Sequence, residues 1–235
     1  MQASSNWIPY VNLKKQWLDE RNDLLPIINE VFESADFIGG YALDKFEENI
    51  ARFCGTKFAC GLNSGTDALI LALSLSGIGR GDEVITPPNS FIASTAAIIH
   101  IGAKPVFVDV LSDQNIDPSK IEIAITKKTK AIMPVHLTGR MCDMDPIINV
   151  ARKYGLVVIE DAAQSVGSKY KGKLSGSIGD VGCFSTHPLK NLNACGDGGF
   201  LTTNNEDIYN KAKSYRNHGI QNRNNVTHFG GVSRL

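Results

Sequence analysis

LVVIEDAA, residues 156–163, places four apolar residues directly before two adjacent carboxylates, Glu160 and Asp161. A short, continuous apolar run is typical of a parallel strand that is buried on both faces. Ligands of parallel α/β sheets bind outside the carboxyl ends of the strands. A carboxylate buried there needs a cationic partner such as a metal ion, an arginine or a protonated ring nitrogen. The stretch therefore predicts a buried strand that ends at a ligand site, and Asp161 also fits a plain helix N-cap.

The sequence on both sides of this stretch alternates between apolar strands and helices. Further apolar runs are VITP (84–87), PVFV (105–108) and AIMPV (131–135), and two short strands are expected over 182–185 and 198–204. Apolar spacing and end signals predict helices over 13–34, 39–55, 64–79, 90–102, 117–126, 143–155 and 206–219. This alternation predicts an α/β fold with a mostly parallel central sheet and helices on both faces. We expect an N-terminal helical segment over 1–35 and a large domain over 36–235, with 221–228 as the most loop-like stretch.

The composition excludes several classes of function. The formal net charge of +0 gives no general attraction to nucleic acid or to an anionic membrane. No apolar run approaches the roughly 18–20 residues of a membrane helix, and the first residues lack the layout of a signal peptide. The five cysteines are scattered without a C-x-x-C pair, which predicts neither a zinc site nor a disulfide framework. Reduced thiols in the cytoplasm are the simplest interpretation.

The first stretch with chemical potential besides the carboxylates is NSGTD, residues 63–67, between an expected strand and an expected helix. Backbone N–H groups at the start of a helix, together with the helix dipole, bind anions. Gly65 allows close approach of the backbone, and Thr66 offers a hydroxyl. The sequence has no Walker motif, so a nucleoside triphosphate is not expected. The same residues also fit a plain N-cap.

The second stretch is FSTHPLKNLNACGDGG, residues 184–199, which carries Lys190 between two short expected strands. Ser185 lies at the end of the first of these strands. Glycines in the loop permit close approach of the backbone. A lysine enclosed by such a loop can serve as a Schiff-base nucleophile, and a solvated surface lysine is the alternative.

These stretches together match what pyridoxal phosphate requires. The phosphate would bind at the helix start in 63–67, Asp161 would keep the pyridine nitrogen protonated, and Lys190 would form the imine. Phe91 follows an expected strand and is placed to cover the ring. Gln164, one helical turn after Asp161, is placed to reach the phenolic oxygen of the ring.

Long stretches of the sequence resemble the DegT/DnrJ/EryC1/StrS family of sugar aminotransferases, which have fold type I of the pyridoxal-phosphate enzymes. The resemblance is carried by GLNSGTDALILAL (61–73), GDEVITPPNSFIAST (81–95), GAKPVFVDV (102–110), IEDAAQSVGSKYKGK (159–173) and GDVGCFSTHPLKNLNACGDGG (179–199). It extends from about Trp7 to the end of the chain. It implies an aspartate-aminotransferase-like large domain and, because family members are longer, a missing C-terminal small domain.

The resemblance also implies roles for particular residues. Lys190 matches the lysine that binds the cofactor as an imine and moves a proton between the two carbons of the imine. Asp161 matches the aspartate on the pyridine nitrogen, Gln164 the residue beside the ring, and Phe91 the stacking aromatic. The matches to phosphate-binding residues are Gly65, Thr66, Asp67 and Ser185. No chemical role follows for His136, which also fits a packed core histidine.

Family members work as homodimers, and their G-x-N-x-R stretch donates an asparagine to the partner's phosphate site. The matching stretch here is residues 230–234, with Val232 in place of the asparagine. Valine cannot form a hydrogen bond to a phosphate. We therefore expect either that Ser233 substitutes for the asparagine or that cofactor binding is weakened.

The activity that the resemblance implies is transfer of an amino group from an amino acid, expected to be glutamate, to a nucleotide-linked keto sugar. Two alternatives stay open. One is a sugar dehydratase of the same family, in which a histidine replaces the lysine; Lys190 and the position of His187 three residues earlier argue against it. The other is a truncated, non-catalytic protein that binds pyridoxal phosphate or has a regulatory role.

Overall fold

The computed structural model describes residues 9–222, 225–226 and 229–235, which form two compact units divided after Gly40. The first unit contains α1 (Leu13–Ser34), which confirms the helix predicted there. The Asn12 side chain accepts a hydrogen bond from the Lys15 N–H at the start of α1, and Ala35 ends it in the left-handed conformation. The domain boundary expected after residue 35 stays a prediction.

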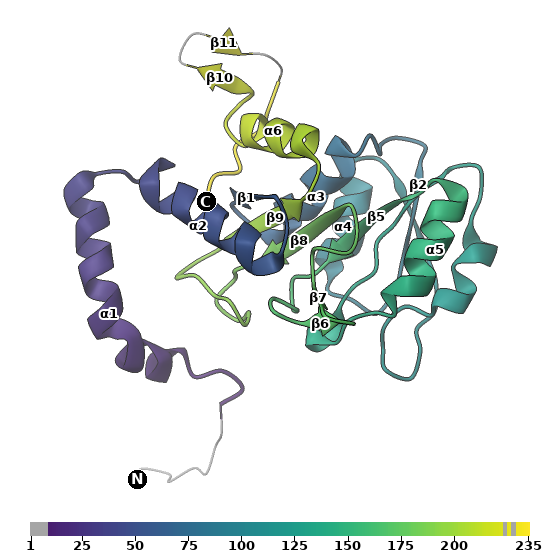
Figure 1. Ribbon diagram of the computed structural model, residues 1–235, viewed down its shortest axis with the longest axis horizontal. Helices are drawn as coiled ribbons and strands as arrows, with labels where there is room; N and C mark the ends of the chain where they lie inside the picture. Colours follow the sequence, from purple (N-terminus) through teal and green to yellow (C-terminus); the bar gives the residue numbers. More distant parts are fainter. Residues whose placement is uncertain (1–8, 223–224, 227–228) are drawn as a thin grey trace, which may run out of the picture. The chain divides into compact units, whose positions relative to one another are not determined.

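The second unit is built around a seven-stranded sheet with the order β1-β9-β8-β5-β4-β2-β3 (Figure 1). Its strands are β1 (Phe58–Leu62), β2 (Glu83–Thr86), β3 (Lys104–Phe107), β4 (Thr129–Ile132), β5 (Val157–Asp161), β8 (Val181–Ser185) and β9 (Gly199–Thr203). β9 runs antiparallel to β1 and β8, and the remaining pairs are parallel. The expected mostly parallel sheet is confirmed, and β5 lies at its centre.

Helices cover both faces of this sheet because its strands carry apolar side chains on both faces. The helices are α2 (Gly40–Cys54), α3 (Gly65–Leu75), α4 (Ile92–His100), α5 (Met144–Tyr154) and α6 (Glu206–Tyr215). Val84 packs in the core beneath α3, α4 and α6, whereas its neighbour Ile85 packs in the core beneath α5. A third core beneath α2 includes Phe184 and Phe200, whose rings stack with centroids 4.5 Å apart. Successive residues of a strand face opposite sides of a sheet, so continuous apolar runs bury both faces.

Two segments differ from the sequence prediction. The helix expected over 117–126 is instead a pair of 3₁₀ turns, η1 (Pro118–Lys120) and η2 (Glu122–Ala124). Isoleucines recur there at every second residue, and β-branched side chains lose χ1 freedom in an α-helix. The stretch expected to be most loop-like contains an antiparallel pair, β10 (Ile220–Asn222) and β11 (Asn225–Val226), with residues 223–224 and 227–228 outside the described residues.

A second short antiparallel pair, β6 (Lys169–Tyr170) and β7 (Lys173–Leu174), follows β5 and was not predicted. No helix within the described part of the chain has both the length and the apolarity that crossing a membrane requires.

Glu160 is a fully buried carboxylate near the carboxyl end of β5. Its Oε1 accepts hydrogen bonds from the N–H groups of Ile178 (2.8 Å) and Gly179 (2.7 Å). Its Oε2 accepts from the Gly176 N–H at 2.9 Å and lies 2.9 Å from Nε2 of His136. Burial alone would raise the pKa of Glu160, but the hydrogen bonds from His136 and from these N–H groups outweigh it and lower the pKa.

His136, whose role the sequence left open, is likewise fully buried. Its Nδ1 accepts a hydrogen bond from the Cys142 N–H at 3.2 Å, so the ring hydrogen sits on Nε2 and points to Glu160. The ring thereby ties the segment after β4 to β5. This is the role of a packed, hydrogen-bonded core histidine.

Replacement of Glu160 by glutamine should lower the free energy of unfolding by about 3 kcal/mol, because the amide nitrogen would face N–H donors that need an acceptor. The lowered pKa adds a pH signature. The stabilisation is fully present above the ordinary glutamate pKa of 4.5 and is lost as the pH falls through the lower pKa of the folded state. Urea unfolding at several pH values measures both effects.

Glu48→Gln is the matched control, because Glu48 forms only exposed ion pairs on α2. It should leave the free energy of unfolding almost unchanged, because exposed ion pairs contribute little to stability. Equal losses in the two variants would contradict the role given to the buried carboxylate.

Candidate active site

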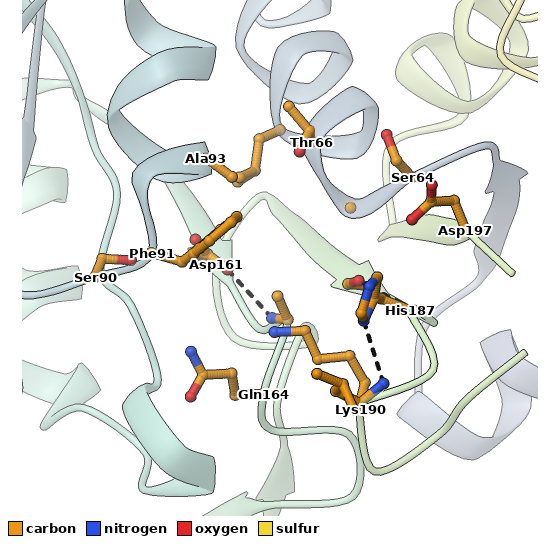
Figure 2. A pocket seen from close by; sticks show the side chains of 15 residues that line it. Ser64, Thr66, Ser90, Phe91, Ala93, Asp161, Gln164, His187, Lys190 and Asp197 are labelled. Carbon is orange, nitrogen blue, oxygen red and sulfur yellow. Dashed lines mark hydrogen bonds between the residues drawn. The ribbon is translucent and has the colours of Figure 1, made fainter. Parts of the chain in front are cut away.

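A cavity of about 430 Å³ lies at the carboxyl ends of β5 and β8, beside the N-termini of α3 and α4 (Figure 2). This is the edge of the sheet at which the sequence predicts a ligand site. Most of the residues singled out from the sequence line it, namely Gly65, Thr66, Phe91, Asp161, Gln164, Ser185 and Lys190. The other lining residues are Ser64, Leu69, Ser90, Ala93, Ala163, His187, Leu189 and Asp197. Its volume falls in the range of small-ligand sites.

Asp67 is the one predicted phosphate-binding residue that does not line the cavity. Its N–H group donates to the side chain of Ser64, the N-cap of α3, at 3.1 Å. The first turn of α3 is therefore capped and also forms part of the cavity wall, and its binding of an anion stays a prediction. Ser64 caps the helix, while Gly65 and Thr66 line the cavity at helix positions whose N–H groups have no partner within the helix. The role of Asp67 stays a prediction.

Asp161 faces this cavity, whereas Glu160 faces the opposite side of the sheet. The strand period of two separates these adjacent carboxylates. Asp161 is nearly fully buried, and its Oδ2 accepts a hydrogen bond from the Ser94 hydroxyl at 2.6 Å. Its Oδ1 accepts from the Ala163 N–H at 3.2 Å. Burial raises the pKa of Asp161, and these hydrogen bonds offset part of the rise.

Lys190 stands at the end of a turn that begins at His187. The Lys190 N–H donates to the His187 carbonyl at 2.8 Å, and Pro188 occupies the second position, which its fixed φ suits. The loop returns to its start where the Thr186 N–H donates to the Gly198 carbonyl at 2.8 Å. The side chain of Lys190 extends across the cavity with its amine toward Asp161 and Gln164 (Figure 2). The lysine thus belongs to the pocket and not only to the surface.

The orientation of the Gln164 amide follows from a backbone contact. Its Oε1 accepts a hydrogen bond from the Thr138 N–H at 2.9 Å. Thr138 adopts φ 54°, in the left-handed region that a branched residue rarely occupies. Since the oxygen is engaged there, the NH₂ group of Gln164 remains as a donor for an acceptor in the cavity.

The aromatic and histidine side chains complete the wall. Phe91 is the N-cap residue of α4, is 68% exposed, and lines the cavity together with Asp161 (Figure 2). The Nδ1 of His187 accepts from the Leu189 N–H at 3.2 Å. Among the described residues, no group of three or more histidine, cysteine, aspartate or glutamate side chains is arranged to hold a metal ion.

The segment that ends the chain packs behind the α3 loop. The Ser233 hydroxyl is buried, accepts from the Asn63 N–H at 3.3 Å and lies 3.4 Å from the Asn63 side-chain oxygen. Val232 is about half exposed. The expectation that Ser233 replaces the family asparagine, or that cofactor binding is weakened, stays a prediction.

The fold and the pocket define a protein of the fold type I aminotransferase class. The chain belongs to the DegT/DnrJ/EryC1/StrS aminotransferase family, whose model matches residues 19–235. It is 44% identical over 229 residues to the dTDP-3-amino-3,6-dideoxy-alpha-D-galactopyranose transaminase of Aneurinibacillus thermoaerophilus, with 97% of this chain and 63% of that protein covered. It is also 44% identical over 213 residues to a pleiotropic regulatory protein of Geobacillus stearothermophilus, with 90% and 57% covered.

Solved structures of proteins similar to this chain have the same fold. The structure of S. venezuelae DesV in complex with a ketimine intermediate superposes with a TM-score of 0.95 at 39% identity, covering 98% of this chain and 62% of that one. The structure of ntda from Bacillus subtilis with bound cofactor PMP gives 0.92 at 36% identity, with 100% and 54% covered. The chain therefore spans between about half and two thirds of the length of these relatives.

Gly199→Ala should disrupt the cavity wall at the start of α3. A Cβ on Gly199 would lie 2.4 Å from the carbonyl carbon of Ser64 and 2.5 Å from the nitrogen of Gly65. The backbone would have to move, at a cost of about 1–3 kcal/mol in stability, and we expect at least tenfold weaker binding of pyridoxal phosphate in a fluorescence titration. Gly196→Ala, in the same loop with no atom near its Cβ, is the control and should bind normally. Equal binding by both variants would refute the packing argument.

Proposed function

We propose that the protein is a pyridoxal-phosphate-dependent aminotransferase that moves an amino group from an amino acid, expected to be glutamate, to a nucleotide-linked keto sugar. The observation that carries this proposal is the convergence of a buried aspartate, a lysine and an open helix start on one cavity. The relatives support the substrate class, since those described as transaminases or aminotransferases act on nucleotide-linked amino or keto sugars by their names.

The donor set of the cavity fits the cofactor. The N–H groups of Gly65 and Thr66 with the Ser185 hydroxyl are suited to a phosphate, and Asp161 is suited to a protonated ring nitrogen. The NH₂ group of Gln164 is suited to a phenolic oxygen, and Phe91 to a ring face. When bound, pyridoxal phosphate supplies an aldehyde that condenses with amines and a ring that withdraws electrons from the attached carbon.

The residues of this chain then have separate tasks. The carboxylate of Asp161 would accept a hydrogen bond from the ring nitrogen and so favour its protonated form. The amine of Lys190 would be the general base that takes a proton from the α-carbon of the amino donor and, as a general acid, would deliver it to the cofactor carbon that keeps the amino group. Asp161 and Lys190 come from different strand ends, β5 and the loop after β8, so the sheet sets the geometry between them.

We also propose that the protein is a cytoplasmic homodimer. Its cysteines are all free, which is consistent with a reducing compartment. A dimer follows from family membership, and in it Val232 would stand where relatives place an asparagine. The large-domain assignment of residues 36–235 belongs to the same proposal.

A non-catalytic regulatory role is the second candidate, because the relative from Geobacillus stearothermophilus is described as a pleiotropic regulatory protein. The presence of Lys190 in the cavity favours catalysis over this role and over the histidine-dependent dehydratase alternative.

Borohydride reduction after incubation with pyridoxal phosphate tests the proposal. The cofactor should become covalently attached to the peptide that carries Lys190, as read by mass spectrometry. Lys190→Ala should lose the adduct and, with glutamate and nucleotide-linked keto sugars as substrates, should lower turnover by about 10²–10⁴-fold. Lys169→Ala, at an exposed lysine, is the matched control. An adduct at Lys190 without turnover on any donor would favour the regulatory candidate, and absence of a selective adduct would refute the proposed site.

A further inference from the structure

Asp161 is held by a chain of two hydroxyl groups that the sequence analysis did not identify. Ser94 lies in the first turn of α4, is 1% exposed, and its Oγ is 2.6 Å from Oδ2 of Asp161. The Oγ of Ser90, a residue of the cavity wall, is in turn 2.6 Å from the Oγ of Ser94. In the described chain, Ser94 is the one side chain that donates a hydrogen bond to Asp161.

The direction of this chain is fixed by the carboxylate. An ionised carboxylate only accepts hydrogen bonds, and a hydroxyl has a single hydrogen. When Asp161 is ionised, as a protonated ring nitrogen opposite it requires, the hydrogen of Ser94 points to Asp161, and the hydrogen of Ser90 is then left to point to Ser94. A 2.6 Å O–H···O⁻ contact lies in the range of charge-assisted hydrogen bonds, which are about twice as strong as neutral ones.

The two donors to Asp161 also define the plane of its carboxylate. Ser94 donates to Oδ2 from α4, and the Ala163 N–H donates to Oδ1 from the segment after β5. Each oxygen keeps a second lone pair, and Asp161 lines the cavity. A carboxylate held at both oxygens from two different elements cannot rotate freely.

We propose that Ser94, oriented by Ser90, is a positioning residue that aims the Asp161 carboxylate at the ring nitrogen of the ligand. This inference rests on the proposed function of the cavity. It gives Ser94 a role beyond helix stability, because its hydroxyl bonds to Asp161 and not to the backbone of its own helix turn. The loss of Ser94 should therefore affect only ligands that possess a ring nitrogen.

The test compares the binding of two ligands, pyridoxal phosphate and its 1-deaza analogue, in which C–H replaces the ring nitrogen. Ser94→Ala should weaken pyridoxal phosphate by about tenfold to a hundredfold, and the analogue by less than about twofold. Ser94→Thr should restore binding of pyridoxal phosphate to within about threefold of the unmodified chain, since threonine keeps the donor. Ser90→Ala should weaken pyridoxal phosphate by a smaller factor than Ser94→Ala.

Two controls separate positioning from folding. Ser76→Ala removes another hydroxyl whose oxygen is buried but has no hydrogen-bond partner in the described chain, and it should leave both affinities unchanged. In an Asp161→Asn background, Ser94→Ala should have little further effect on pyridoxal phosphate, because coupled residues are not additive.

Equal weakening of both ligands by Ser94→Ala, or no weakening of either, would overturn the role of Ser94 while leaving the proposed function intact. Failure of the unmodified chain to bind pyridoxal phosphate at Lys190 would instead overturn the proposed function and the role of Ser94 with it. The comparison within one variant stays decisive even if that variant is less stable, since both ligands meet the same protein.

Discussion

The buried carboxylate of Glu160 is the constraint on which the site depends. An unpaired charge of this kind in an apolar sheet would be strongly destabilising. Four donors offset that penalty here, and they come from two segments, His136 after β4 and the N–H groups of residues 176–179 before β8. Satisfying one charge therefore fixes the chain on both sides of β5. Because Asp161 is the next residue of β5, the same contacts hold its backbone in place.

The separation of Glu160 and Asp161 shows how a strand gives two identical groups different functions. The period of two turns them to opposite faces, and the surroundings of each face decide the rest. Glu160 meets enough donors to lower its pKa, whereas burial raises the pKa of Asp161 because its donors are fewer. The protein itself supplies the hydrogen-bond donors that the Glu160 carboxylate needs. The Asp161 carboxylate has fewer donors, and it is the one that lines the cavity.

The sequence predicted the features that depend on local signals. Continuous apolar runs located the strands, helix-start residues located α3, and the loop with Lys190 was correctly placed between β8 and β9. The same signals could not give the strand order or the antiparallel direction of β9, because these depend on pairings between distant segments. The helix expected over 117–126 was wrong because its isoleucines favour neither α-helical packing nor α-helical χ1 angles.

The candidate site divides in the same way. Asp161, Gln164 and Lys190 could be named from position alone, but the contacts that orient them join residues far apart in sequence. The Gln164 amide is oriented by Thr138, and the Asp161 carboxylate by Ser94. One signal was present in the sequence, since Ser90 and Ser94 stand four residues apart on either side of Phe91, the N-cap residue of α4. Without the position of β5 beside α4, nothing in that spacing identifies what the hydroxyls contact.

The cavity is consequently polarised, and its polarity limits what it can bind. One end is a buried carboxylate with spare lone pairs, and the other is a helix start with N–H groups of the first turn. Among the described lining residues, Lys190 is the one lysine or arginine. A ligand that carries a ring cation at one end and a phosphate at the other satisfies both ends at once, whereas a simple anion would leave the burial of Asp161 uncompensated. A ligand with a cationic ring would therefore offset part of the free energy that burying Asp161 costs, which ties the selectivity of the cavity to this carboxylate.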